Sequence, residues 1–281
     1  MTEPPKNRTT PRAVMTIAGS DCSGGAGMQA DLKTFQHFGL HGLTAVTCIV
    51  SETAHIVRRV DPVDPSMMED QIRLMLAGFP LTAVKTGMLG SAEHVRRVAH
   101  IFRAHPHVAL VVDPVMIAST GASLLEPDAI EVYKNDLLPL ATVITPNIPE
   151  AETLLGHAIT GQDEMEAAAR ELSESYGCAV LLKGGHLGGD ECTDLLFENE
   201  SVHRFTSPRQ NIQASHGTGC TLAAAVASGL ALGKSLTDSV ATAKAYLDES
   251  LATSYSFQSP NGETLHALNQ GTFKLQILNS K

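Results

Sequence analysis

A short segment in the C-terminal third of the chain combines two glycines, a threonine and a cysteine directly before an apolar helix. The segment reads Gly217-Thr218-Gly219-Cys220 and precedes a run of small and apolar residues, 222–232, with good helix propensity. Glycines at a loop-to-helix junction leave backbone N–H groups uncovered, and the first N–H groups of a helix have no partner within it. The segment therefore predicts a pocket for an anion.

Cys220 lies within the first turn of this predicted helix. There the positive end of the helix dipole favours the thiolate over the thiol, so the sequence predicts a proton-accepting side chain beside the anion pocket. The alternative is an ordinary helix N-terminus that contains glycine and a buried cysteine. The residues of this segment do not decide between the two interpretations.

Polar or glycine-rich groups also follow several predicted strands. These groups are the loop 19–27, Glu52, Asp113, Asn147 with Glu150, and Lys183 with Gly184 and Gly185. In open parallel sheets ligands gather outside the carboxyl ends of the strands, so we expect the groups to share one crevice. Asp113 follows a continuous apolar strand, where a carboxylate is costly unless a cation or hydrogen bonds accompany it. Lys183, at the end of another buried strand, likewise needs an anionic partner.

Ordinary structural roles stay open for three residues near these strand ends. Glu52 can be a solvated loop acid, Glu150 a first-turn acid placed for the helix dipole, and Met88 core filling rather than the wall of a flat ligand site. The glycine loop 19–27 between a strand and a helix has the parts of a phosphate cradle. It matches neither the Walker nor the Rossmann pattern.

Strand and helix patterns alternate along the chain and predict a three-layer α-β-α domain with a mostly parallel central sheet flanked by helices. The predicted strands are 13–18, 44–50, 81–86, 108–112, 142–145 and 179–183, with a hairpin at 194–206. The predicted helices are 28–38, 65–79, 91–102, 127–138, 164–176, 222–232 and 237–251. Residues 1–12 read as a flexible polar tail without the apolar segment of a signal peptide, and 13–281 as a single domain. Beyond residue 252 the pattern is weak apart from a turn at 259–262.

The bulk composition excludes several classes of partner. The chain has 281 residues, 43% of them hydrophobic, with a net charge of -10, which argues against nucleic acid or an anionic membrane surface as the main partner. No apolar stretch reaches the ~20 residues that span a bilayer. The five cysteines show no CxxC pair and no zinc-like spacing, which favours a reducing, cytoplasmic location.

The crevice groups suit phosphoryl transfer, because that reaction depends on positioning and charge neutralisation. A divalent cation near the acids, a lysine, N–H donors and a base beside the attacking oxygen would suffice. Cys220 is the candidate base, and the N–H groups of Gly217 to Cys220 would hold the transferred group. A general base is typically worth ~10²–10⁴ in rate, and one anion-hole donor ~10²–10³. We therefore expect Cys220→Ala to slow turnover severely while nucleotide still binds.

Several ordered motifs resemble those of the hydroxymethylpyrimidine/phosphomethylpyrimidine kinases of thiamine biosynthesis, which have the ribokinase-like fold. The motifs are the block 19–34, Lys85-Thr86-Gly87-Met88, Asp113-Pro114-Val115-Met116, Thr145-Pro146-Asn147 with Glu150, Lys183-Gly184-Gly185-His186, and His216-Gly217-Thr218-Gly219-Cys220. The resemblance runs from about Val14 to Leu251, and its most specific stretches are 19–34 and 216–220.

The resemblance implies an ATP-dependent kinase that phosphorylates 4-amino-5-hydroxymethyl-2-methylpyrimidine and then its monophosphate, usually as a homodimer. It implies one set of residues for each ligand. The acceptor would bind to Gly19, Asp31, Glu52 and Met88, with Asp31 at its hydroxymethyl group. ATP would bind to Asn147, Lys183, Gly217 and Gly219, and Mg²⁺ would be served by Asp113 and Glu150. The catalytic group would consist of Gly217, Thr218, Gly219 and Cys220.

Glu52 departs from the family pattern, which has glutamine at this place. A glutamine both donates and accepts hydrogen bonds, whereas a carboxylate only accepts unless it is protonated. Glu52 could still pair with the exocyclic amino group and a protonated ring nitrogen of the pyrimidine. A pyridoxal kinase, which shares the fold and the phosphoryl chemistry, is the first alternative. A non-enzymatic nucleotide-binding regulator is the second. A cysteine nucleophile with His216 as its partner is a third, without an accompanying acyl-transfer motif.

Overall fold

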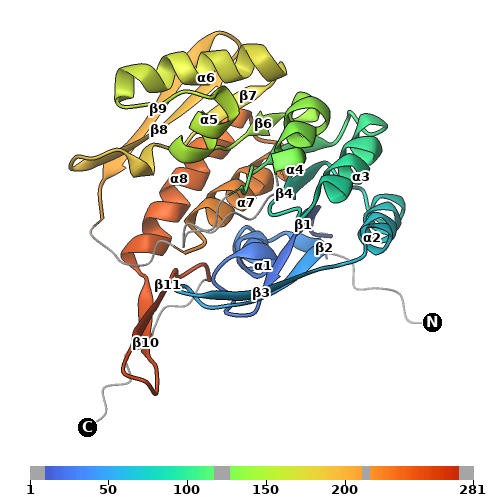
Figure 1. Ribbon diagram of the computed structural model, residues 1–281, viewed down its shortest axis with the longest axis horizontal. Coiled ribbons are helices and arrows are strands. Elements are labelled where there is room, and N and C mark those ends of the chain that lie inside the picture. The colour runs from blue at the N-terminus through green and yellow to red at the C-terminus, as the bar shows by residue number, and fades with distance from the viewer. Residues whose placement is uncertain (1–9, 117–126, 211–215, 272–281) are drawn as a thin grey trace.

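The computed structural model of the protein describes residues 10–116, 127–210 and 216–271, and its centre is one nine-stranded sheet (Figure 1). The strand order is β3-β2-β1-β4-β5-β6-β7-β8-β9. The strands are β1 (Ala13–Asp21), β2 (His41–Glu52), β3 (Val57–Pro62), β4 (Ala83–Thr86), β5 (Ala109–Val112), β6 (Val143–Ile144), β7 (Ala179–Leu182), β8 (Glu191–Glu198) and β9 (Ser201–Pro208). Neighbouring strands from β2 to β7 are parallel, and β3, β8 and β9 pair antiparallel at the two edges.

Helices cover both faces of the sheet, so the predicted three-layer architecture is confirmed (Figure 1). One face carries α1 (Gly27–His37), α7 (Thr218–Ala231) and α8 (Leu236–Ala252). The other face carries α2 (Pro65–Gly78), α3 (Ala92–Arg103), α4 (Pro127–Val132), α5 (Ile148–Leu155) and α6 (Gln162–Tyr176). The central strands are apolar on both faces because both faces are covered.

The strand order has a switch point beside β1. The chain moves from β1 outward to β2 and β3, returns to β4 on the other side of β1, and then continues outward through β5, β6 and β7. At such a point the connections leave β1 and β4 in opposite directions, and a crevice opens at the carboxyl ends of the strands. The fold therefore places the ends of β1, β4, β5 and β7 around one space.

Several element boundaries differ from the sequence prediction. β1 continues to Asp21, because Ser20 and Asp21 still pair with β2. The antiparallel strand β3 was not predicted. The predicted helix 127–138 is α-helical only to Val132. It then widens into a π-helical turn, Tyr133–Leu137, and ends in a 3₁₀ turn, Leu138–Leu140, where Pro139 cannot continue an α-helix.

The C-terminal region is more ordered than its sequence pattern indicates. β10 (Tyr255–Gln258) and β11 (Thr264–Ala267) form a separate hairpin that projects from the body in Figure 1. Gly262, with φ +84°, lies in the predicted turn between them. The chain then returns to the core, where Gln270 is only 2% exposed. Residues 1–9 of the predicted tail and 272–281 lie outside the described residues.

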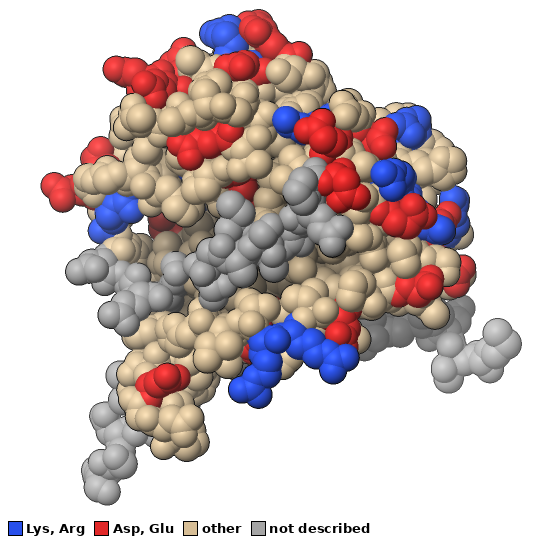
Figure 2. Space-filling model, viewed as in Figure 1, with Lys and Arg blue, Asp and Glu red and all other residues tan. Residues whose placement is uncertain are grey.

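The surface carries charges of both signs. On the face shown in Figure 2, acidic side chains gather over α5 and α6 at the top of the view, and basic and acidic side chains alternate over α2 and α3 at the right. This pattern agrees with the net charge of -10. None of the helices in the described ranges is long and apolar enough to cross a membrane.

Candidate active site

A cavity of about 650 Å³ opens at the carboxyl ends of the parallel strands. Most of the residues predicted from the sequence line it. These are Gly19, Glu52, Met88, Asp113, Asn147, Lys183, Gly217, Thr218, Gly219 and Cys220. Asp31 and Glu150 are the two predicted site residues that do not line the cavity. The fold thus brings together groups from six strand ends, those of β1, β2, β4, β5, β6 and β7, and from one helix N-terminus, as expected from their positions after strands.

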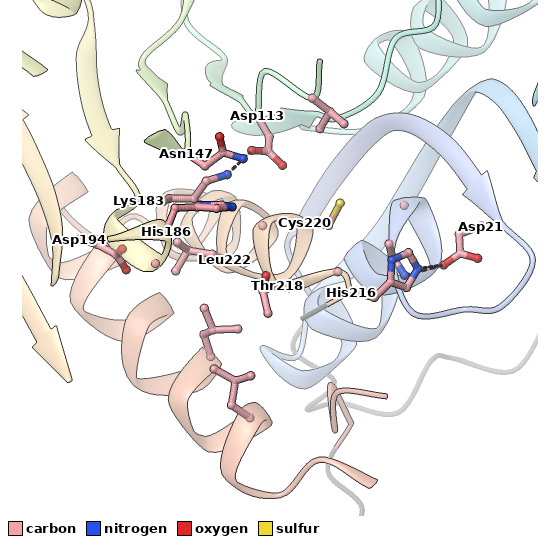
Figure 3. Close-up of a pocket in the computed structure, with 18 of the residues that line it drawn as sticks. Asp21, Asp113, Asn147, Lys183, His186, Asp194, His216, Thr218, Cys220 and Leu222 are labelled. Atoms are coloured by element: carbon pink, nitrogen blue, oxygen red, sulfur yellow. Dashed lines mark hydrogen bonds and ion pairs between the residues drawn. The ribbon is translucent and has the colours of Figure 1, made fainter. Parts of the chain in front are cut away.

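We call residues 216–220, which lead into α7, the anion loop. The backbone conformation of this loop requires glycine at position 217. Gly217 is the N-cap of α7 and has φ +81°, in the left-handed region that favours glycine. A Cβ on Gly217 would also overlap the carbonyl oxygen of Gly25 in the loop after β1. The first bond of the helix runs from Thr221 N to Gly217 O at 2.9 Å. The first turn, Thr218 to Cys220, therefore presents its backbone end to the cavity (Figure 3).

Lys183 and Asp113 form a buried ion pair beside this loop. Lys183 Nζ lies 2.9 Å from Asp113 Oδ1, and the two side chains face each other in Figure 3. A Cβ on Gly219 would lie 3.2 Å from Lys183 Nζ, so the ammonium group borders the anion loop. Burial opposes ionisation of Asp113, but Lys183 and Lys85 more than offset it and hold the pKa of Asp113 below its usual range. The predicted need of each buried charge for a partner is confirmed.

Glu150 has the structural role that the sequence left open. It forms a capping box with Asn147 at the start of α5, with Asn147 N donating to Glu150 Oε2 at 2.8 Å and Glu150 N to Asn147 Oδ1 at 2.9 Å. Its Oε2 also lies 3.9 Å from Lys183 Nζ. Burial raises the pKa of Glu150 to about 7. Glu150 therefore lies behind the cavity wall and supports the Asn147 backbone there.

Asp31 lies below the cavity rather than in it. Its carboxylate is fully buried, 2.9 Å from Lys85 Nζ, and accepts a hydrogen bond from Thr16 Oγ1 at 2.6 Å. Burial would lower the pKa of Lys85, but the Asp31 carboxylate more than offsets it, so the pKa is raised and the ammonium form is favoured. Lys85, not Asp31, lines the cavity. The direct contact of Asp31 with an acceptor hydroxyl does not fit this arrangement.

Lys85 was missed by the sequence reasoning, although its position carried a signal. It lies in the apolar strand β4, all four residues of which are buried. A lysine within a buried strand needs an anionic partner, the same argument that singled out Lys183.

The environment of Cys220 overturns the expected preference for thiolate. Cys220 lines the cavity and is partly exposed. Burial nevertheless raises the pKa of Cys220 to about 11, while the nearby Lys85 ammonium acts in the opposite direction. The desolvation of the sulfur, together with the nearby Asp31 and Asp113 carboxylates, outweighs the Lys85 ammonium; the sequence argument considered only the helix dipole. Cys220 is therefore mainly a thiol at neutral pH, and Lys85 is the charge placed to stabilise its thiolate.

Asp21 organises the glycine loop after β1. Its carboxylate accepts hydrogen bonds from the backbone of Ser23, Gly25 and Ala26 at 2.7 to 3.0 Å. His216 Nε2, from the anion loop, lies 3.0 Å from Asp21 Oδ2, as the dashed line in Figure 3 shows. Burial by itself would raise the pKa of Asp21. The hydrogen bonds to the carboxylate more than offset that effect and hold the pKa far below its usual range. Asp21 thus ties the two glycine loops together, a role that the sequence alone did not indicate.

The opposite wall of the cavity holds the residues implied for the acceptor. A Cβ on Gly19 would lie 2.7 Å from Cys48 Sγ and 3.8 Å from Met88 Sδ, so the strand end is packed tightly there. Thr47 Oγ1 donates to Met88 O at 2.6 Å and holds the loop after β4. Burial, and to a smaller extent the nearby Asp21 carboxylate, raises the pKa of Glu52 above its usual range. Glu52 is therefore a cavity-wall acid rather than a solvated loop acid.

A second buried ion pair marks the far end of the cavity. Lys244 Nζ, from α8, lies 3.0 Å from Asp194 Oδ2, and Asp194 Oδ1 accepts a hydrogen bond from Gly184 N at 2.9 Å. The Arg209 guanidinium donates to the carbonyl groups of Gly185 and Gly189 at 3.0 and 2.8 Å. These contacts fix the loop after β7, which the sequence reasoning did not assign to any partner.

The carboxylates near Lys183 fit a magnesium ion that arrives with a phosphate ligand. Mg²⁺ is usually held by one or two carboxylates together with phosphate oxygens and waters. Asp113 Oδ2 would lie 3.7 Å from a Cβ on Gly219, so this oxygen borders the anion loop. Within residues 10–116, 127–210 and 216–271, no cluster of three or more His, Cys, Asp or Glu side chains is placed to hold a metal. The Asp113 carboxylate beside this loop therefore suits a metal that is shared with a nucleotide.

Comparison with known proteins gives the chain a family. The model of the phosphomethylpyrimidine kinase family matches residues 21–265. The chain belongs to this family. The predicted enzyme class, a kinase, is thereby confirmed, and so is the recognised family resemblance.

Individual relatives agree with this assignment. The hydroxymethylpyrimidine/phosphomethylpyrimidine kinase of Rhizobium meliloti (strain 1021) is 42% identical over 239 residues, 85% of this chain and 90% of that protein. The thiamine biosynthesis bifunctional protein ThiED of Geobacter sulfurreducens is 41% identical over 256 residues, 91% of this chain, and this chain spans 52% of that longer protein.

A solved structure supports the fold. The pyridoxal kinase from Staphylococcus aureus, in complex with AMP-PCP and pyridoxal, aligns with a TM-score of 0.84 and 34% identity over 95% of this chain and 96% of that chain. The ribokinase-like α/β fold implied by the resemblance is confirmed.

Proposed function

We propose that the protein is an ATP-dependent kinase that phosphorylates 4-amino-5-hydroxymethyl-2-methylpyrimidine and then its monophosphate, in thiamine diphosphate biosynthesis. The observation that carries the proposal is the convergence of Cys220, the anion loop and the Lys183–Asp113 pair in one cavity. Gly19, Glu52 and Met88 form one end of that cavity. Membership of the phosphomethylpyrimidine kinase family supports the choice of acceptor.

The first step breaks the O–H bond of the acceptor hydroxyl and the bond between the γ-phosphorus and the ADP oxygen, and it forms a new O–P bond and an S–H bond at Cys220. In the second step the nucleophile is an ionised oxygen of the monophosphate, so only the bond to phosphorus is exchanged. We assign the γ-phosphoryl group to the backbone N–H groups of Gly217 to Cys220, where a helix N-terminus favours negative charge. Lys183 would neutralise phosphate charge beside that loop. The acceptor proton passes to Cys220 Sγ in its thiolate form, which Lys85 stabilises.

Magnesium would supply further charge neutralisation on the phosphates when it is bound with ATP. Asp113 would hold it directly or through water, and Glu150, behind the wall, would act on its hydration shell. Asn147 would contact the nucleotide from the same edge of the cavity. These assignments rest on the positions of the residues and on the family resemblance.

We also infer a homodimer in the cytoplasm. Ile49 and Ile56, on the β2–β3 edge of the sheet, are 59% and 55% exposed, and Phe257 on the β10–β11 hairpin is 59% exposed. His55 Nε2 lies 3.4 Å from Thr264 O, which brings the edge and the hairpin together. Apolar side chains grouped this way suit contact with a second copy. The five cysteines are free thiols in the described residues, and such free thiols support the proposed cytoplasmic location.

A pyridoxal kinase is the second candidate, because the chain is similar to a solved pyridoxal kinase and because Glu52 replaces the family's glutamine. One coupled assay separates the candidates. It measures ADP release from ATP with the aminopyrimidine alcohol, its monophosphate or pyridoxal as acceptor. Turnover of both pyrimidines is expected. Turnover of pyridoxal alone would replace the proposal with the second candidate, and turnover of none would favour a nucleotide-binding regulator.

A further inference from the structure

The two glycine loops of the active site interlock. The carbonyl oxygen of Gly25 lies against the Cα of Gly217, so that a Cβ on Gly217 would overlap it. A Cβ on Gly25 would in turn lie 2.8 Å from Cδ2 of His216. The loop after β1 borders the acceptor end of the cavity, and the loop before α7 carries the anion-binding N–H groups. Their spacing therefore sets the distance between acceptor and phosphoryl group.

Gln270, from the segment that follows β11, holds both loops from behind. Its Nε2 donates to Gly25 O at 3.0 Å and to Thr221 Oγ1 at 2.9 Å. Thr221 Oγ1 donates in turn to Gly217 O at 2.7 Å. One side-chain amide thus connects the first loop directly and the second loop through the Thr221 hydroxyl.

The segment that carries Gln270 is firmly docked. Tyr246 Oη, from α8, donates to Gln270 O at 2.8 Å, and Asn269 N donates to Ser250 O at 3.2 Å. Leu268 is buried in the core cluster formed by α1, α7 and α8. The Gln270 amide therefore has a fixed position from which to hold the two loops.

A glutamine at this buried position costs folding free energy if it serves only to fill space. Its side chain is 2% exposed, and its Oε1 has no hydrogen-bond partner among the described residues. A buried acceptor without a partner costs free energy that an apolar side chain of the same shape would avoid. The gain must come from the two donor contacts that its Nε2 makes with the loops.

We propose that Gln270 is a positioning residue for phosphoryl transfer, which sets the spacing between the acceptor loop, through Gly25, and the anion loop, through Thr221 and Gly217. This inference rests on the proposed phosphate site at Gly217 to Cys220. Alignment of anion-hole donors matters most in the transition state, so the contribution of Gln270 belongs to kcat rather than to ground-state binding.

Gln270→Met tests the proposal, because methionine keeps the length of the side chain and removes the donor. Two neutral hydrogen bonds of ordinary strength, about 1 kcal/mol each, correspond to about a 30-fold loss of kcat. KM for ATP and for the acceptor should stay within about twofold. Thr221→Val removes the hydroxyl that links Gln270 to Gly217 O. This variant serves as the test if Gln270→Met does not fold.

Two controls separate positioning from loss of stability. Ile159→Val loosens the core on the other face of the sheet, away from Gln270 and from both loops, so it should lower the melting temperature and leave kcat unchanged. In the double variant Gln270→Met/Thr221→Val, kcat should fall little further than in either single variant, because both act through one connection. Wild-type kcat in Gln270→Met, or additive losses in the double variant, overturns the proposal.

Hydrogen exchange gives a readout that needs no turnover. The backbone amides of residues 24–27 and 217–220 should exchange faster in Gln270→Met than in the wild type, and unchanged exchange in both segments contradicts the inference. If the wild-type protein phosphorylates neither pyrimidine nor pyridoxal, the proposed function fails and the positioning role fails with it, whereas the exchange result still decides whether Gln270 holds the two loops together.

Discussion

Replacing Cys220 tests the proposed chemistry most directly, because its sulfur is the only proton acceptor that we assign to the reaction. Cys220→Ala removes the sulfur, and Cys220→Ser keeps the size of the side chain but offers a much weaker acid. Both variants leave the backbone N–H groups of the anion loop in place. Nucleotide binding should therefore survive, whereas proton removal should not.

The size of the effect follows from the role of a general base, typically ~10²–10⁴ in rate. This range corresponds to about 3 to 5 kcal/mol of transition-state stabilisation. Lys85 also contributes to the function of Cys220 as a base, because its ammonium group favours the Cys220 thiolate. We expect kcat to fall by at least about a hundredfold in both variants.

The pH dependence gives a sharper test. The pKa of Cys220 is raised to about 11 by burial, so near pH 8 only ~0.1% of the thiol is ionised. If the thiolate accepts the proton, kcat of the wild type should rise about tenfold per pH unit through the neutral and mildly alkaline range. The residual activity of Cys220→Ala should lack this dependence.

The assay is ADP release at saturating ATP and acceptor, with nucleotide affinity measured separately by calorimetry. Turnover of Cys220→Ala within tenfold of the wild type would refute the assignment of the base. A wild-type kcat that does not change with pH, together with a large loss in the variant, would leave the sulfur important but exclude its titration as the reason.

Three further predictions concern other parts of the cavity. Burial raises the pKa of Glu52, so Glu52→Gln should remove a pH dependence of KM for the aminopyrimidine that lies above the usual titration range of a glutamate, measured by initial rates; a persisting dependence contradicts the role of this acid. Lys85→Met leaves the buried Asp31 carboxylate unpaired and should lower the free energy of unfolding by about 3–5 kcal/mol in urea titrations; a loss near zero would show the pair to be dispensable. Gly217→Ala, at φ +81° against the neighbouring loop, should cut kcat by roughly 10², whereas Gly78→Ala, with open space around it, should leave kcat unchanged.

Local sequence patterns predicted the groups at the ends of the strands well. Lys183 and Asp113 each follow a buried strand, and the cost of an isolated buried charge predicts a partner for each. The structure shows that they are each other's partner. The same reasoning would have identified Lys85 within β4, because the rule depends only on a charged residue in an apolar strand.

Other roles depend on residues far away in the sequence. Asp31 pairs with Lys85, 54 residues away, and this pairing draws its carboxylate below the cavity. Gln270 lies 245 residues from Gly25, in a stretch with little pattern of its own. No local periodicity or spacing indicates such contacts, because they arise only when the helices pack against the sheet.

The sequence by itself determined the α/β class, the order of the main strands and helices apart from β3, α5 and the C-terminal hairpin, and the residue types at each strand end, since these follow from apolar periodicity and from the cost of buried charge. Only the tertiary structure decided which strand ends meet, that Asp31 is set back behind Lys85, and that burial raises the pKa of Cys220 to about 11. The physical reason is that desolvation and ion pairing depend on everything that surrounds a group, whereas a helix dipole or a strand end can be read from its immediate neighbours.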